Sequence, residues 1–411
     1  MAIVPLLASE GSLCDVRVAP TLASKPGSEA GFYNPKRRVG RDFVVLSVAQ
    51  WLAAEAACSG EPRPARLLDA TCAAGVQGLR VAVESPLLAR AISKDEPPEL
   101  QVVLNDIDEN AADLAADNAA SLRQAVAVTC RVAQALMHEE TFQVSVLDPF
   151  GCVQPFLDAA MARAPHGGLV EVCATDVGAL YGNRPEITAR HYNAHLAQKR
   201  PPCYRERGVR ILVAAIAQAA GRHDRGVMPV FGVSTEHFCL VSVRVIRRAK
   251  AADATAKQVQ RVRICRSCGA AGVDANTTQC DCDPVDGAGI NAQEEGPMWV
   301  GPLYDADAVQ AMARIASLEE AKGLVSKETR ALLEKVQEEA VINRMFHRRP
   351  GVAAGGRTPK LAKVMKELQR RGFKTARTHF CVKSLKTDAS VREFDSAVKA
   401  VLACENHGVS A

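Results

Sequence analysis

The chain has 411 residues, of which 48% are hydrophobic and 24% are charged, and its formal net charge is +5. This length exceeds one ordinary core of about 100–200 residues, so length and composition indicate a globular protein of two or three domains. No apolar run reaches the length of about 18 residues that a transmembrane helix needs, and the first residues lack the order of a signal peptide, which favours a cytoplasmic protein.

Helix-like and strand-like stretches alternate along the first half of the chain. The spacing of apolar residues predicts helices over residues 43–57, 76–91, 109–122 and 153–164. Short apolar runs predict strands over residues 65–70, 100–104, 125–132, 144–147 and 169–174. Strands separated by helices of this length indicate an α/β fold with a parallel, doubly wound sheet. Two more strands would form a hairpin at the edge of this sheet, over residues 227–233 and 238–246.

The chain changes in composition after about residue 248. Residues 249–256 look like a linker, so we place a boundary there between a first domain, residues 1–248, and a second, residues 249–411. The second region holds a cluster of cysteines, a Gly-rich segment and a helical, basic tail.

The tail carries most of the excess positive charge. Residues 344–386 contain thirteen Lys or Arg and a single acid, Glu367. Such an excess indicates binding to a nucleic acid, since phosphates neutralise the mutual repulsion of the cations, although a solvated basic helix is the alternative. Within the tail, residues 361–368 predict an amphipathic helix that ends near Gly372, and Phe380 is expected in a core.

Residues at the carboxyl ends of the predicted strands are the candidates for a ligand site, because open parallel sheets bind ligands there. Asp69 ends the first strand, and Gly75 would let the backbone approach a ligand where the next helix begins, although a plain strand-to-helix turn fits as well. Asp106 ends the second strand, where a carboxylate can accept hydrogen bonds from ribose hydroxyls of a nicotinamide cofactor or of S-adenosylmethionine. Asp108 has a competing role as a helix N-cap.

The segment Asp148-Pro149-Phe150-Gly151 decides between these two cofactors. An exocyclic amino group of guanine is a poor nucleophile, and a carboxylate and a carbonyl that accept its two N–H groups would activate and align it. Asp148 supplies the carboxylate, Pro149 the carbonyl, and Phe150 a face on which a base can stack. The alternative is a turn that only ends a strand.

Several blocks of the sequence together resemble the tRNA guanine-26 N2-dimethyltransferase family. The matching blocks are Phe32-Tyr33-Asn34-Pro35, Arg41-Asp42, Leu67-Leu68-Asp69, Asn105-Asp106, Asp148-Pro149-Phe150-Gly151, Thr175-Asp176 to Gly182, Glu206 to Leu212, a cluster of four cysteines from Cys265 to Cys282, Gly301-Pro302-Leu303-Tyr304, Arg377-Thr378-His379-Phe380 and Lys386-Thr387-Asp388. The resemblance implies a Rossmann-like class I methyltransferase domain followed by a smaller α+β, zinc-containing domain that binds tRNA. It also implies transfer of one or two methyl groups from S-adenosylmethionine to N2 of guanine 26, by a protein that we expect to be a monomer.

The resemblance assigns roles to particular positions of this chain. The catalytic residues would be Asp148, Pro149, Phe150 and Phe32. The cofactor would be held by Arg41, Asp69, Gly75, Arg80, Asp106 and Ala133. Val132 stands where the family has an acid for the adenine amino group, so the backbone at Ala133 is expected to recognise adenine. Methyl transfer to an amine of another nucleic acid, and RNA binding without catalysis, are the alternatives.

Four cysteines lie close together as Cys265-x2-Cys268 and Cys280-x-Cys282. The first pair has the spacing of a zinc knuckle, and the second pair is a less usual half-site. We expect a structural Zn²⁺ at Cys265, Cys268, Cys280 and Cys282, with reduced thiols without a metal as the alternative. Four cysteine ligands would leave no open position for catalysis by the metal.

Overall fold

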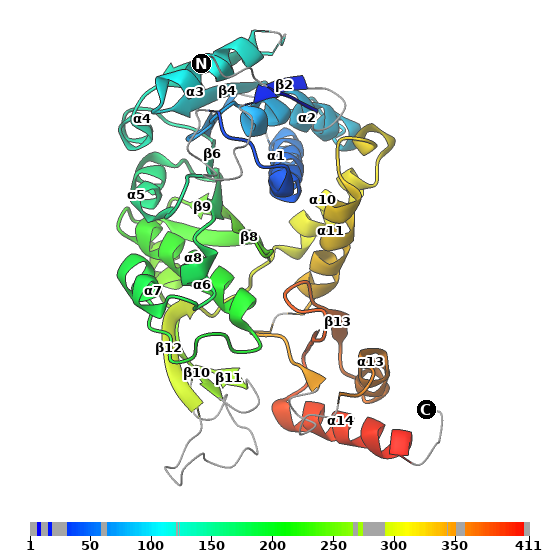
Figure 1. The fold of residues 1–411 in the computed structure, drawn as a ribbon. Coiled ribbons are helices and arrows are strands. Elements are labelled where there is room, and N and C mark those ends of the chain that lie inside the picture. Colours follow the sequence, from blue (N-terminus) through cyan, green and yellow to red (C-terminus); the bar gives the residue numbers. More distant parts are fainter. Residues whose placement is uncertain are drawn as a thin grey trace.

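A seven-stranded sheet in the order β5-β4-β3-β6-β7-β9-β8 lies at the centre of the fold (Figure 1). The structure, a computed structural model, describes residues 6–9, 15–18, 31–58, 64–120, 122, 124–265, 270–273, 292–342, 344–350 and 358–406. The strands of the sheet are β3 (Ala65–Asp69), β4 (Leu100–Asp106), β5 (Val126–Cys130), β6 (Val144–Leu147), β7 (Leu169–Ala174), β8 (Gly226–Ser234) and β9 (Cys239–Ile246). The first five are parallel, and β9 pairs antiparallel with both β7 and β8. The predicted parallel sheet and its hairpin are confirmed.

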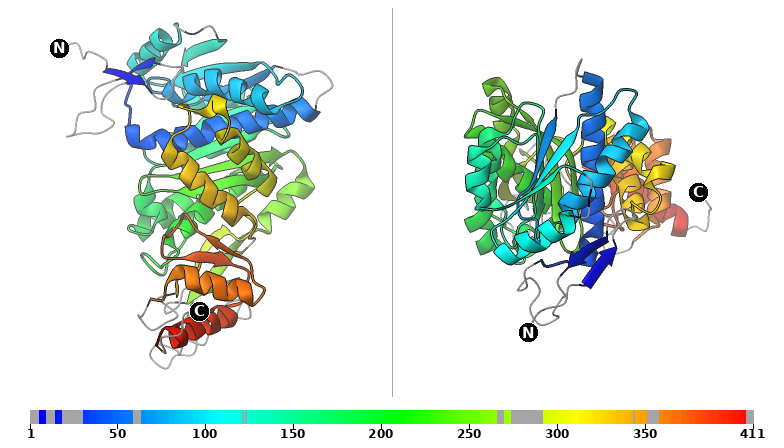
Figure 2. Two further views of the ribbon diagram at one scale, coloured as in Figure 1. Left: turned by 90° about the vertical axis from the view of Figure 1, so that its right-hand side faces the viewer. Right: turned by 90° about the horizontal axis from the view of Figure 1, so that it is seen from above.

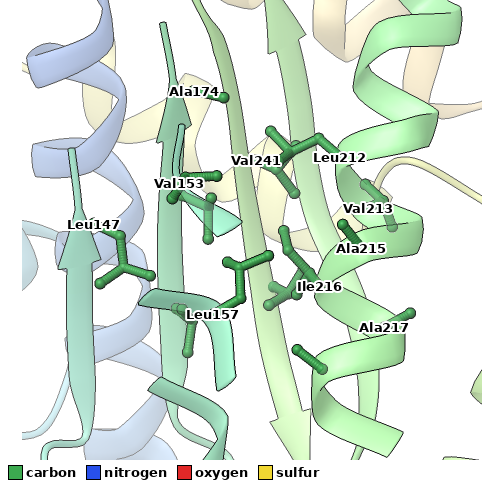
Figure 3. Packing of buried hydrophobic residues seen from close by; sticks show 14 of the residues in the cluster. Leu147, Val153, Leu157, Ala174, Leu212, Val213, Ala215, Ile216, Ala217 and Val241 are labelled. Atoms are coloured by element: carbon green, nitrogen blue, oxygen red, sulfur yellow. The ribbon is translucent and has the colours of Figure 1, made fainter. Parts of the chain in front are cut away.

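Helices cover both faces of this sheet (Figure 2). One face carries α1 (Arg38–Cys58), α2 (Val76–Ile92) and α3 (Glu109–Ala119). The other carries α4 (Ala133–Glu139), α5 (Gln154–Arg163) and α8 (Tyr204–Gly221), and the short helices α6 (Val177–Leu180) and α7 (Pro185–Tyr192) connect β7 to α8. Figure 3 shows Leu157 of α5 and Ile216 of α8 packed over the strands. The apolar periodicity of these helices therefore reports the faces that they bury.

Residues 249–256 form a helix, α9 (Ala249–Ala256), so the prediction of a linker is wrong. The alanines of this segment favour a helix, and Ala252 is buried. The Thr255 hydroxyl accepts a hydrogen bond from the Val227 amide of β8 at 3.1 Å. The chain therefore stays attached to the large sheet beyond the predicted boundary.

A second, three-stranded sheet follows in the order β11-β10-β12, with β10 (Val259–Cys265), β11 (Ala271–Gly272) and β12 (Ala292–Trp299). The chain then returns to the first region through α10 (Ala306–Ala316), the 3₁₀ turn η3 (Glu319–Ala321) and α11 (Lys327–Ala340). Val309 and Met312 of α10 share a core with α1 and α2. The buried Asp42 of α1 accepts hydrogen bonds from the Ser326 amide at 2.9 Å and the Thr329 hydroxyl at 2.7 Å. Residues beyond 300 thus complete the core of the first region.

The last part of the chain forms a small α+β unit at one end of the molecule (Figure 1). It comprises α13 (Leu361–Arg370), β13 (Thr375–Arg377), β14 (Leu385–Thr387) and α14 (Val391–Asn406). Gly372 follows the predicted amphipathic helix with a φ of +91°, and the Phe373 amide donates to the Leu368 carbonyl at 3.0 Å. Phe380 is buried, as expected. Near the other end, β1 (Leu6–Ser9) pairs antiparallel with β2 (Asp15–Val18). None of the helices in the described ranges could cross a membrane.

Candidate active site

A cavity of about 380 Å³ opens at the carboxyl ends of the parallel strands, where the strand order reverses between β3 and β6. Ligands of open α/β sheets bind at such a reversal because the chain leaves neighbouring strands in opposite directions there. The cavity is lined by predicted residues from five separate parts of the sequence: Phe32, Arg41, Asp69, Asp106, Asp148, Pro149 and Phe150. The fold therefore brings most of the predicted site residues together.

Asp69 lies at the end of β3 and is fully buried, with Oδ2 accepting a hydrogen bond from the Gly78 amide at 3.0 Å. Burial, together with the neighbouring carboxylates of Asp148 and Asp106, raises the pKa of Asp69 to about 7. Four aspartates and two arginines, Arg37 and Arg41, line the cavity, so its formal charge is negative. This excess of negative charge favours a cationic ligand.

Asp106 is held rigidly at the end of β4. Its Oδ2 accepts from the Ala73 amide at 2.8 Å, and its Oδ1 accepts from the Asp108 amide at 3.1 Å. Each carboxylate oxygen has a second lone pair, so Asp106 can still accept from a ligand in the cavity. Asp108 is the N-cap of α3, as its competing role predicted, and accepts from the Asn110 amide. The two acids thus have separate positions.

Asp148, directly after β6, is paired with a residue that the sequence had not singled out. Arg37 donates from Nη2 to Asp148 Oδ2 at 2.6 Å and to the thiol sulfur of Cys173 at 2.7 Å. Arg37 ends the 3₁₀ turn η1 (Pro35–Arg37), in which the Asn34 side chain accepts a hydrogen bond from the Lys36 amide. Arg37 lies two residues after the Phe32-to-Pro35 block, and this was the one sequence feature that could have pointed to it. Its pairing with Asp148 could not be predicted, because the two residues are over one hundred positions apart in the chain.

Two aromatic rings flank the mouth of the cavity. The ring centroids of Phe32 and Phe150 are 5.1 Å apart in an edge-to-face arrangement. Phe150 is 62% exposed, so much of its ring is accessible to a ligand at the cavity. Gly151 follows with a φ of +78°, a conformation that ends the segment in a turn.

Arg41 lines the cavity and donates to the Asn34 carbonyl at 2.9 Å, and its guanidinium lies 5.0 Å from the centre of the Tyr33 ring. Arg80 lies elsewhere. It is fully buried between Asp42 and Glu84, at 2.8 Å from each, and donates to the Leu324 carbonyl. Arg80 therefore links α1, α2 and the segment before α11. It does not line the cavity, so the structure does not place it in the predicted contact with a cofactor.

Gly75 and Ala133 are the other predicted residues that do not line the cavity. Gly75 precedes α2 with a φ of +81°, and a Cβ there would lie 3.0 Å from the Leu104 side chain, so only glycine fits the turn. Ala133 begins α4 after the N-cap Val132. Gly75 therefore shapes the turn from behind the cavity.

Two uncharged polar atoms in the cavity wall lack hydrogen-bond partners among the described residues. They are the Thr71 hydroxyl and the Gln77 side-chain nitrogen, both buried. Buried polar atoms without partners cost free energy unless a ligand or water satisfies them. These atoms fit a polar ligand such as S-adenosylmethionine, and the sequence reasoning had missed both.

The sequence model of the N2,N2-dimethylguanosine tRNA methyltransferases matches residues 17–399. The chain belongs to this family. It is 30% identical to the tRNA (guanine(26)-N(2))-dimethyltransferase of Methanopyrus kandleri, over 94% of each chain. It is 27% identical to the tRNA (guanine(27)-N(2))-dimethyltransferase of Rattus norvegicus, over 93% of this chain and 62% of the rat protein.

A solved family structure shares the fold. Trm1 from Pyrococcus horikoshii, in complex with S-adenosyl-L-methionine, superposes with a TM-score of 0.76 at 26% identity, over 95% of this chain and 99% of that one. The α/β methyltransferase fold expected from the resemblance is confirmed. The cavity described above lies at the carboxyl ends of the strands, where S-adenosylmethionine is expected from the sequence.

Two of the blocks shared with the family, Glu206 to Leu212 and Lys386-Thr387-Asp388, contribute buried ion pairs that hold the fold together. Lys386 is buried and contacts Glu206 Oε1 at 2.7 Å, and Arg210 contacts the same atom at 2.9 Å. Burial opposes ionisation of Glu206, but these cations and the nearby His347 hold its pKa well below its usual range. The network fastens the small C-terminal unit to α8. Lys386 therefore does not add to the exposed charge of the tail.

Only one of the four clustered cysteines is among the described residues. Cys265 ends β10 and is buried, whereas Cys268, Cys280 and Cys282 lie outside the described residues. The zinc site stays a prediction.

Proposed function

We propose that the chain transfers one or two methyl groups from S-adenosylmethionine to the exocyclic N2 of guanine 26 in tRNA. The observation that carries this proposal is Asp148, held by Arg37 at the carboxyl end of β6 beside the exposed ring of Phe150. A carboxylate and a stacking face in one polar cavity suit a flipped base with an amino group. The family membership supports the same reaction.

Asp148 would accept one N–H of the guanine amino group, and the Pro149 carbonyl would accept the other. These two acceptors direct the nitrogen lone pair toward the methyl group and hold it in line. Phe150 and Phe32 would hold the plane of the base. When S-adenosylmethionine is bound, it supplies an electrophilic sulfonium methyl group, which needs no metal for activation. As the carbon–nitrogen bond forms and the carbon–sulfur bond breaks, the Asp148 carboxylate takes the surplus amino proton and passes it to solvent.

The cavity offers groups for each part of the cofactor. Asp106 would accept from the ribose hydroxyls, and Arg41 would pair with the methionine carboxylate. The unpartnered Thr71 hydroxyl and Gln77 nitrogen face the same space. The excess of carboxylates around Asp69 suits the positive sulfonium. The backbone at Ala133, the first residue of α4, is proposed to contact adenine, which would then extend beyond the cavity lining.

The basic tail and the cysteine cluster after residue 249 are proposed to position the tRNA, whereas α10 and α11 of the same region pack on the core of α1 and α2. Exposed cations of the tail would contact phosphates without reading the sequence. A structural zinc is proposed to be bound by Cys265, Cys268, Cys280 and Cys282 of this region. We propose that the protein works as a monomer in the cytoplasm.

Mass spectrometry of nucleosides from tRNA treated with the protein and labelled cofactor tests the proposal. Label on N2-methylated guanosine, lost when guanine 26 of the transcript is replaced by adenine, is expected. Label that persists in this transcript and disappears when guanine 27 is replaced would move the target to position 27, which the similarity to the rat protein makes the second candidate. Label on adenosine or cytidine alone, or none, would refute the guanine N2 reaction.

The role of Asp148 is tested by Asp148→Asn. The variant should keep its affinity for tRNA and lose about 100- to 10,000-fold in methyl transfer, as expected for a group that accepts a proton in the transition state. Asp158→Asn is the matched control, since Asp158 is an exposed carboxylate on α5 that pairs with Arg222. Near-normal turnover of Asp148→Asn would show that another group accepts the proton.

A further inference from the structure

Three side chains of types that can bind a metal ion lie close together, and none of them lines the cavity. The Cys152 sulfur, an Asp176 carboxylate oxygen and a His191 ring nitrogen all lie within 4.8 Å of one another. They come from three parts of the chain: the loop after β6, the N-cap of α6 and the last turn of α7. The fold, and no local motif, brings these ligand types together.

The facing atoms of Asp176 and His191 have no hydrogen-bond partner among the described residues. Asp176 Oδ2 and His191 Nδ1 are both buried, and they are 3.8 Å apart. This separation exceeds the roughly 2.7–3.2 Å of a hydrogen bond. It is close to the roughly 3.3–3.6 Å between two ligand atoms that share a tetrahedral ion at about 2.0–2.2 Å from each. An ion between them would satisfy both atoms.

The other oxygen of Asp176 is already held. Tyr192 donates its hydroxyl proton to Asp176 Oδ1 at 2.7 Å and is itself almost fully buried. A hydrogen bond of this kind orients a metal-binding carboxylate and leaves the second oxygen directed at the ion. The hydrogen bond from Tyr192 therefore holds Asp176 in the orientation that a shared ion would need.

We propose that Cys152, Asp176 and His191 bind a divalent ion of the zinc class. A thiolate and an imidazole favour zinc over magnesium or calcium, which prefer oxygen ligands. Three protein ligands leave a fourth position for water or another small ligand. Cys152 follows the Asp148-to-Gly151 segment directly, and Asp176 follows Thr175 of the cavity wall. The ion thus anchors the catalytic segment to α6 and α7, apart from the methyl-transfer chemistry and from the cysteine cluster near residue 265.

Titration of the metal-free, full-length protein with Co²⁺ and with Zn²⁺ tests this site. Wild type should bind one more equivalent of Co²⁺ than Cys152→Ser, which loses part of the thiolate-to-cobalt absorption. His191→Ala should lose the same equivalent, and the cysteine cluster, which contains no histidine, is unaffected by it. Tyr192→Phe should keep the equivalent but bind it about 10- to 100-fold more weakly.

Cys58→Ser is the matched control, because Cys58 is exposed at the end of α1 and should leave metal binding unchanged. The side chain of His191 is 31% exposed, so His191→Ala keeps the fold and decides the matter if Cys152→Ser does not fold. Equal numbers of bound Co²⁺ ions and equal spectra for wild type and His191→Ala would overturn the proposal. The readout is metal content, so it is independent of the transferase activity.

Discussion

Replacing Arg37 with methionine should lower kcat for methyl transfer by about 10- to 150-fold and leave KM for the cofactor nearly unchanged. Arg37 does not touch the reacting atoms in the proposed reaction, but its hydrogen bond to Asp148 fixes the orientation of the carboxylate that accepts the amino proton. Loss of this bond should therefore weaken an interaction used in the transition state rather than in binding.

The magnitude follows from the geometry of the pair. The Arg37 and Asp148 atoms are 2.6 Å apart, with side chains 11% and 30% exposed. Breaking a fully buried ion pair costs about 3–5 kcal/mol, but the exposure of Asp148 lets water screen it. A hydrogen bond to a charged group, worth about 1.5–3 kcal/mol, is the better measure. At about 1.4 kcal/mol for each factor of ten, this corresponds to the stated range.

Transfer of radiolabelled methyl groups to a tRNA transcript, at saturating cofactor and tRNA, measures kcat directly. Arg37→Lys keeps the positive charge without the planar guanidinium and should fall between wild type and Arg37→Met. Arg38→Met is the control, since the neighbouring Arg38 donates to the Gly323 carbonyl, away from Asp148. A kcat for Arg37→Met within about twofold of wild type would refute the positioning role.

Three further changes test other parts of the site and fold. Phe150→Ala should lower kcat/KM for tRNA by roughly 5- to 150-fold, because stacking of one base on an aromatic ring is worth about 1–3 kcal/mol. Its thermal stability should equal that of wild type, since the ring is exposed. Cofactor affinity, measured by calorimetry, should fall about tenfold as the pH is lowered from 7.5 to 6. Asp69, with a pKa of about 7, takes up a proton in this range, and the negative charge that favours the sulfonium is then lost. Lys386→Met should reduce the free energy of unfolding by about 3 kcal/mol and lower the urea midpoint, because it removes a cation from the buried Glu206.

Each of these changes has a control that could contradict it. Phe150→Tyr keeps the ring and should retain tRNA affinity, and equal losses in both variants would exclude stacking. Asp69→Asn should abolish the pH dependence of cofactor binding between 6 and 7.5, so a persisting dependence would assign it to another group. Lys383→Met, an exposed neighbour, should leave the urea midpoint unchanged, and an equal drop would show that Lys386 contributes only its general charge.

The elements of the sheet could be predicted because buried strands and amphipathic helices leave a strong apolar periodicity. The strands β3, β4 and β7 begin or end within about two residues of the predicted limits. The helix α9 was missed, since its alanines show little periodicity and its contact with β8 is tertiary. The return of α10 and α11 to the core of α1 could not be predicted either, because it depends on which apolar surface was left uncovered.

The sequence by itself determined the order of strands and helices, the acids at the strand ends and the exposed aromatic segment after β6. Each of these follows from local pattern: period, turn chemistry and the rule that ligands bind at carboxyl ends. Only the tertiary structure decided that Arg37, and not Arg80, reaches the cavity, and that Cys152, Asp176 and His191 share one site. Such pairings depend on which distant segments pack together, and packing across a fold leaves no spacing in the sequence from which it can be read.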